Sequence, residues 1–211
     1  MDAALRAGVA VYNAGEHHAA HDAWEEEWLD LPDGSDDERL LHGLIQYTAA
    51  VYHARRLNWS GATGLAASAR EYLADLPATY RDVDVAGARA ALAALEGDPE
   101  RVERGPPAPL RYDGRALALR DLRDDFEAAA VAAGVLAEEY EDRYDPGVLA
   151  DAVRYAREEL DEGGTRTRFT TFVVDFVADA DSRDLVHDRL RSHVRRRRSR
   201  DRDVEGLFEE S

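Results

Sequence analysis

Imidazole, carboxylate and amide side chains recur at helical spacing in two neighbouring stretches near the start of the chain. His17, His21 and Glu25 follow one another at every fourth residue, and Gln46 and His53 lie two turns apart in the next stretch. Residues four apart on a helix stand about 5–6 Å apart at Cβ, so each set lies on one helical face. Neutral imidazole together with carboxylate binds zinc, manganese, nickel or ferrous iron. The pattern therefore indicates a divalent-metal or small-ligand pocket between two helices.

The side chains of this pocket divide into metal ligands, ligand contacts and a candidate base. The predicted metal ligands are His21, Glu25, His53 and His17, and the predicted ligand-binding residues are Gln46 and Trp28. His42 is an alternative source of the imidazole from the second stretch. Glu25 is also the candidate catalytic residue, because burial beside tryptophan raises the pKa of a carboxylate towards neutrality. His18 and Asp22 fall towards the solvated side of the same helix and are poorer candidates.

Two function classes remain open for this pocket. In an enzyme, the pattern favours metal-assisted hydrolysis, with Glu25 taking a proton from a metal-activated water. The alternative is a non-enzymatic structural or protein-interaction module in which the His/Glu cluster is a core polar network. The chain lacks an HExxH motif, a glycine-rich phosphate loop and a Ser-His-Asp order. The absence of cysteine excludes disulfides, thiolate metal sites and a cysteine nucleophile.

The charge of the chain is strongly negative. All 27 basic residues are arginine, against 44 acidic residues, and the formal net charge is −17. Such charges repel one another in dilute buffer, whereas in molar salt the screening length falls to about 3 Å. The acid-rich, lysine-free composition is similar to that of soluble proteins from salt-accumulating halophiles, and we interpret it as adaptation to a salty cytoplasm. Nucleic-acid binding is not expected over most of this surface, because phosphates need cationic partners.

The arginine run Arg195–Arg198 is the exception to this acidity. It could bind nucleic-acid phosphates or an acidic partner. A solvated helix end is the favoured interpretation, because aspartates interleave the run and the helix dipole stabilises cations there. No stretch approaches 18 consecutive apolar residues, and the first residues lack the basic start of a targeting signal. We therefore expect a cytoplasmic protein without a membrane segment, and the sequence leaves homo-oligomerisation open.

Helical periodicity predicts an all-α fold with an N-terminal helical bundle followed by further helices. Asn13 with Glu16, and Ser35 with Glu38, have the spacing of capping boxes at helix starts. Asp145 before Pro146 predicts the start of a further helix, and Gly163 and Gly164 predict its end. The expected helices span residues 2–12, 14–30, 36–57, 65–76, 84–96, 121–141, 146–161, 168–177 and 182–200.

A proline-rich stretch divides the chain into a helical bundle, residues 1–96, and a mainly helical region, residues 97–211, whose last helix is rich in arginine. The Asp113-Gly114 pair predicts one short β-hairpin near residues 110–119.

The strings YNAGEHHAAHDAWEEEWLDL and LLHGLIQYTAAVYHARRLNWSGATGLAASAREYL resemble the family catalogued as domain of unknown function 309, over about residues 9–76. The family's His-x3-Glu-x2-Trp element is matched by His21, Glu25 and Trp28, and its Gly-Leu-Ile-Gln stretch by residues 43–46. His53 and the Gly61-Ala62 pair also match, whereas His17 and His42 have no assigned place in the pattern. The resemblance implies a small all-helical bundle and points to the same face of the chain. It implies no activity, because the family has none established.

Overall fold

Helices make up the regular structure of this protein. The computed structural model describes residues 1–164 and 167–209, with side chains as far as residue 203. Its helices are α1 (Asp2–Asn13), α2 (His17–Leu29), α3 (Asp36–Arg55), α4 (Trp59–Leu73), α5 (Val85–Gly97), α6 (Arg101–Arg104), the 3-10 helix η1 (Leu119–Leu122), α7 (Phe126–Glu139), α8 (Pro146–Asp161), α9 (Arg168–Ala178) and α10 (Arg183–Glu209). No strand forms within these described residues, so the all-α prediction is confirmed.

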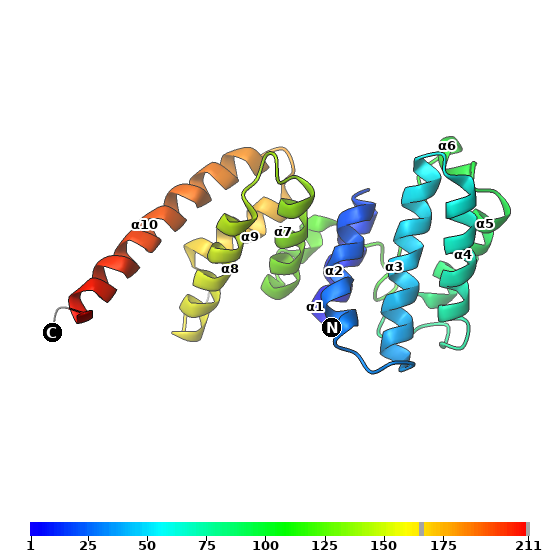
Figure 1. Ribbon diagram of the computed structural model, residues 1–211, viewed down its shortest axis with the longest axis horizontal. Coiled ribbons are helices and arrows are strands. Elements are labelled where there is room, and N and C mark those ends of the chain that lie inside the picture. Colours follow the sequence, from blue (N-terminus) through cyan, green and yellow to red (C-terminus); the bar gives the residue numbers. More distant parts are fainter. Residues whose placement is uncertain (165–166, 210–211) are drawn as a thin grey trace.

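The helices form an elongated row rather than a sphere (Figure 1). α3, α4, α5 and α6 occupy one end, α1, α2 and α7 the middle, and α8, α9 and the long α10 the other end. None of the described helices is both long and apolar enough to cross a membrane.

Side-chain caps start several of these helices where the sequence predicts them. Ser35 Oγ accepts a hydrogen bond from the Glu38 amide at 3.1 Å at the start of α3. The Asp145 carboxylate accepts from the Gly147 amide at 2.9 Å, with proline at the first position of α8. Gly163, at φ 96°, takes the left-handed conformation that lets the chain leave α8. Local polar chemistry therefore fixes these boundaries.

Asn13 does not cap α2, so this prediction is wrong. α2 begins after Glu16 and has no side-chain cap. The Asn13 amide Nδ2 donates to the carbonyls of Leu110 and Leu117, both at 2.9 Å, and Oδ1 accepts from the Leu110 amide at 2.9 Å. The Asn13 side chain therefore binds a distant loop to the end of α1 instead of capping α2.

The predicted β-hairpin is reduced to its turn. Asp113 and Gly114 have φ values of 49° and 70°, and Tyr112 and Arg115 exchange two backbone hydrogen bonds of 2.8 and 3.0 Å. The bridges at this turn are isolated, and no strand extends from it. Three prolines at positions 106, 107 and 109 precede the turn, and proline has no amide to donate to a ladder.

One continuous buried cluster runs from Ala4 to Val194, and α1 lies in its centre. α1 packs against both α2 and α7, which also contact each other. The fully buried Trp24 of α2 lies directly against Gly8 of α1, where an added Cβ would overlap the indole ring. Residues after 97 therefore share a core with the N-terminal helices, and the division of the chain at that point stays a prediction.

The Trp24–Gly8 contact predicts opposite effects for two alanine substitutions. Gly8→Ala should lower the free energy of unfolding by about 1–3 kcal/mol, because the new methyl group forces the indole to move. Gly64→Ala in α4 is the matched control, since nothing lies within 4 Å of a Cβ there. It should raise that free energy by about 0.5–1 kcal/mol. Urea unfolding measures both, and shifts of the same sign would contradict the packing.

Candidate functional site

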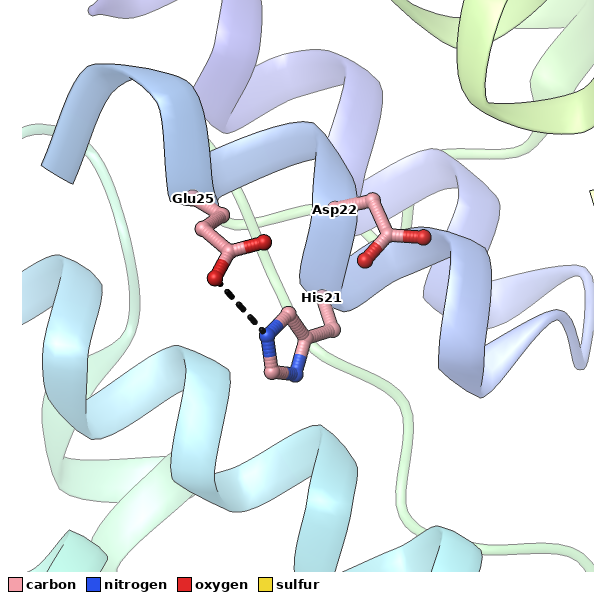
Figure 2. A group of neighbouring side chains, drawn as sticks. All are labelled: His21, Asp22 and Glu25. Atoms are coloured by element: carbon pink, nitrogen blue, oxygen red, sulfur yellow. Dashed lines mark ion pairs between the residues drawn. The ribbon is translucent and has the colours of Figure 1, made fainter. Parts of the chain in front are cut away.

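A cluster of metal-ligand side chains lies on the outer face of α2. His21, Asp22 and Glu25 each offer one ligand atom, and these atoms lie within 4.8 Å of one another (Figure 2). His21 Nε2 is 3.9 Å from Glu25 Oε1. The side chains of His21, Asp22 and Glu25 are 33%, 31% and 48% exposed, so the cluster is open to solvent. Within residues 1–164 and 167–203 it is the one such group of three or more side chains.

Asp22 belongs to this cluster although the helical-wheel prediction places it on the solvated side. At about 100° per residue, positions 21, 22 and 25 share an arc of roughly 100°, so Asp22 marks the edge of the same face. His18 extends this edge towards α7, because its Nδ1 lies 3.6 Å from the Asp22 carboxylate and 2.9 Å from Glu139 Oε2. The prediction missed Asp22 because it centred the face on the two tryptophans.

A second polar group lies on α3 and joins three helices. The carboxylate of Glu38 accepts hydrogen bonds from the Trp28 indole at 3.0 Å and from His42 Nδ1 at 3.1 Å. His42 Nε2 in turn accepts from the Gln46 amide at 3.0 Å. The His42 ring stacks on Tyr72 of α4, with 3.8 Å between ring centroids. This chain of contacts crosses from α2 through α3 to α4.

The environment of this second group is largely closed. The side chains of Glu38 and His42 are 13% and 20% exposed. Burial alone would raise the pKa of Glu38, but hydrogen bonds from Trp28 and His42 hold it below its ordinary value. Gln46 Oε1 is buried without a hydrogen-bond partner among the described groups. These features are those of a polar network that holds helices together.

The remaining predicted ligands lie apart from the α2 cluster. His17 is buried and meets the Tyr12 ring edge-on, with 5.0 Å between centroids. His53 Nδ1 lies 2.8 Å from the Asn58 amide nitrogen, at the turn between α3 and α4. Neither histidine belongs to the cluster of Figure 2. Of the four predicted metal ligands, the structure therefore brings together His21 and Glu25.

The surroundings of Glu25 differ from those on which its catalytic role was predicted. Trp24 points into the core against α1, and Trp28 packs on His42. The Glu25 side chain is 48% exposed. The burial on which the general-base prediction rests is therefore missing, and the catalytic role stays a prediction.

An acidic groove of about 910 Å³ lies next to the cluster, between α1–α2 and α7–α8. Its floor is apolar and includes Val131, Val135 and Leu149. Arg157 is the one basic side chain in its lining, and it pairs with Glu127 at 2.6 Å. The carboxylates that line the groove are Asp22, Glu25, Glu26, Glu27, Asp30, Glu127 and Glu138. The groove is therefore apolar below and negative at its walls.

Comparison with protein families gives a match for the N-terminal part of the chain. Residues 5–65 match the family model described as Domain of unknown function (DUF309). The match confirms the resemblance of the N-terminal region. The matched residues extend from α1 into α4 and include the α2 cluster together with Glu38, His42 and Gln46. No curated protein matches the chain.

The buried His17 predicts a loss of stability in acid. Burial, together with the positive charge of Arg55, lowers the pKa of His17 to about 4, from an ordinary 6.5. The unfolded chain then binds more protons between these values, so stability falls as the pH drops below 6.5. Between about pH 7 and pH 5 this effect should cost about 2 kcal/mol through His17 alone.

Urea unfolding of the parent chain and of His17→Gln at the two pH values measures this effect. The variant should lose most of the pH-dependent difference. His53→Gln, which removes an imidazole from α3, is the control and should behave as the parent does. An unchanged pH dependence in His17→Gln would show that other groups cause it.

Proposed function

We propose that the chain binds a divalent metal ion at the α2 cluster of His21, Asp22 and Glu25. One imidazole and two carboxylates form a donor set suited to zinc, manganese or ferrous iron. The observation that carries this proposal is the convergence of the three ligand atoms to within 4.8 Å of one another. Ligand atoms bound at about 2.1 Å lie about 3 Å apart, so small side-chain rotations would suffice.

The ionic surroundings of the cluster support this proposal. Most carboxylates that pair in this chain pair with arginine, as Asp37 does with Arg81 at 2.5 Å. The cluster carboxylates instead have histidine partners within the described region, namely His18 for Asp22 and His21 for Glu25. Their negative charge is therefore not already neutralised by a guanidinium. The neighbouring acidic groove adds to the attraction for a cation.

An ion held by three side chains keeps further coordination positions for water, which is the arrangement used in metal-assisted hydrolysis. Hydrolysis is therefore the reaction class to assay on metal-loaded protein. In this arrangement Glu25 acts as a ligand, and the cluster contributes binding and orientation of the ion.

Titration with Mn²⁺, followed by the spectrum of free Mn²⁺ in electron paramagnetic resonance, tests the site. About 1 M NaCl should screen general attraction to the acidic surface. We expect one ion per chain, and binding should be weakened about tenfold or more in His21→Ala and in Glu25→Ala.

The control for this titration is His53→Ala, which removes a sequence-predicted ligand that lies outside the cluster. It should bind as the parent does, and all three variants should keep their helical circular dichroism. Equal weakening in His53→Ala, or the absence of stoichiometric binding, would refute the site.

The acidic groove favours a second candidate function, that of a protein-interaction module. Its apolar floor and carboxylate walls fit a cationic amphipathic helix, with leucines facing the floor and arginines facing the walls. Electrostatic complementarity of this kind gives specificity and speeds association. The Glu38–His42–Gln46 network then has a purely structural role.

Fluorescence anisotropy with a synthetic helix of leucine and arginine tests this second function. Val131→Arg, which places a cation on the floor of the groove, should abolish binding in about 1 M NaCl. Val174→Arg, at a half-buried valine of α9 outside the groove, is the matched control and should leave binding intact. Equal binding of a scrambled peptide would reveal mere adsorption to an acidic surface.

A further inference from the structure

The four arginines of the run Arg195–Arg198 have different surroundings in the structure. Arg197 pairs with Glu158 at 3.5 Å and with Asp201 at 3.1 Å, and Arg198 pairs with Asp151. Both arginines therefore join α10 to α8, and Arg197 also links two neighbouring turns of α10. Half of the run is used to hold the last helix in place.

Other arginines gather at a pocket between the end of α8, the start of α9 and the middle of α10. This pocket has a volume of about 650 Å³, and its lining includes Arg168, Arg196, Arg200, His193 and Ser199. We call it the arginine pocket. Such a volume lies within the range of about 300–1,000 Å³ typical of small-molecule sites.

The charge of the arginine pocket is positive in a chain of net charge −17. Glu159 is the acidic residue of the described lining, and the three arginines of the lining outnumber it. None of Arg168, Arg196 and Arg200 forms an ion pair with a carboxylate whose side chain the structure describes. Three arginines therefore line this cavity, and no carboxylate among the described side chains pairs with them.

His193 lies in the same positively charged environment as the three arginines. Its ring stacks on Phe172, with 5.3 Å between centroids, and its Nδ1 lies 3.5 Å from Arg168 Nη1. Burial lowers the pKa of His193, and the positive charges of Arg196 and Arg168 lower it further. These surroundings therefore favour the uncharged form of the imidazole, which lies beside two cations from different helices.

We propose that the arginine pocket binds a compact phosphate-bearing anion. Guanidinium groups bind phosphate oxygens through two parallel hydrogen bonds, and here they come from both α9 and α10. Ser199 adds a hydroxyl donor to the lining. An extended polyanion fits less well, because carboxylates such as Asp188 of α10 and Glu158 of α8 lie on helices that form the pocket.

Isothermal titration of the full chain with inorganic pyrophosphate, in metal-free buffer at about 0.2 M and 2 M NaCl, tests this proposal. We expect one saturable site per chain. Arg196→Ala and Arg200→Ala should each weaken binding about tenfold or more, because each removes a charged hydrogen-bonding group. Both side chains are exposed on α10, so both variants should fold.

Two matched variants separate this site from other causes. Arg195→Ala removes the same charge one residue away, outside the pocket, and should leave affinity within about twofold. His21→Ala removes the proposed metal site and should leave pyrophosphate binding unchanged. Equal weakening in Arg195→Ala, or no saturable binding, would overturn the proposal. Tighter binding of a short RNA that is lost equally in all arginine variants would do the same.

Discussion

The contact between the Trp24 indole and the backbone at Gly8 determines how α2 lies on α1. A helix advances about 100° per residue, so burying one side chain sets the direction of all the others. With Trp24 inside, His17 is carried into the core, whereas the cluster residues emerge on the side that faces solvent. The indole nitrogen has no hydrogen-bond partner among the described groups, so shape and apolar contact hold it in place. The candidate metal site therefore depends on a glycine in another helix.

Ion pairs within the described part of the chain leave many carboxylates without a partner, because acidic residues outnumber basic ones and the formal net charge is −17. Arginine–carboxylate pairs join helices across the surface, as between Arg70 of α4 and Glu96 of α5 or between Arg157 of α8 and Glu127 of α7. Seven carboxylates line the groove beside α2, and three arginines line the pocket at α10. These two helices lie in the middle and at one end of the molecule (Figure 1). The two regions that we propose as sites are those where side chains of one charge predominate in the lining of a cavity.

Much of the helix order followed from periodicity and local caps, since Ser35 and Asp145 act within a few residues of themselves. The errors came from side chains with distant partners. Asn13 has the chemistry of a cap, yet it bonds to a loop about a hundred residues away. The candidate site was predicted in part, since its helix and two of its residues were identified. Gln46 was expected to contact a ligand between α2 and α3, but its side chain binds His42 on its own helix. The arginine pocket needs Arg168 from α9, which no local pattern joins to α10.

The central position of α1 has a consequence for the synthesis of the chain. One face of this helix is covered by α7, which begins more than a hundred residues later. At about 5–20 residues per second, the ribosome makes α7 roughly 6–20 s after α1 has emerged. During that interval an apolar surface of the nascent protein has no native cover. Its solubility before release then depends on the acidic side chains of the first helices and on cellular chaperones.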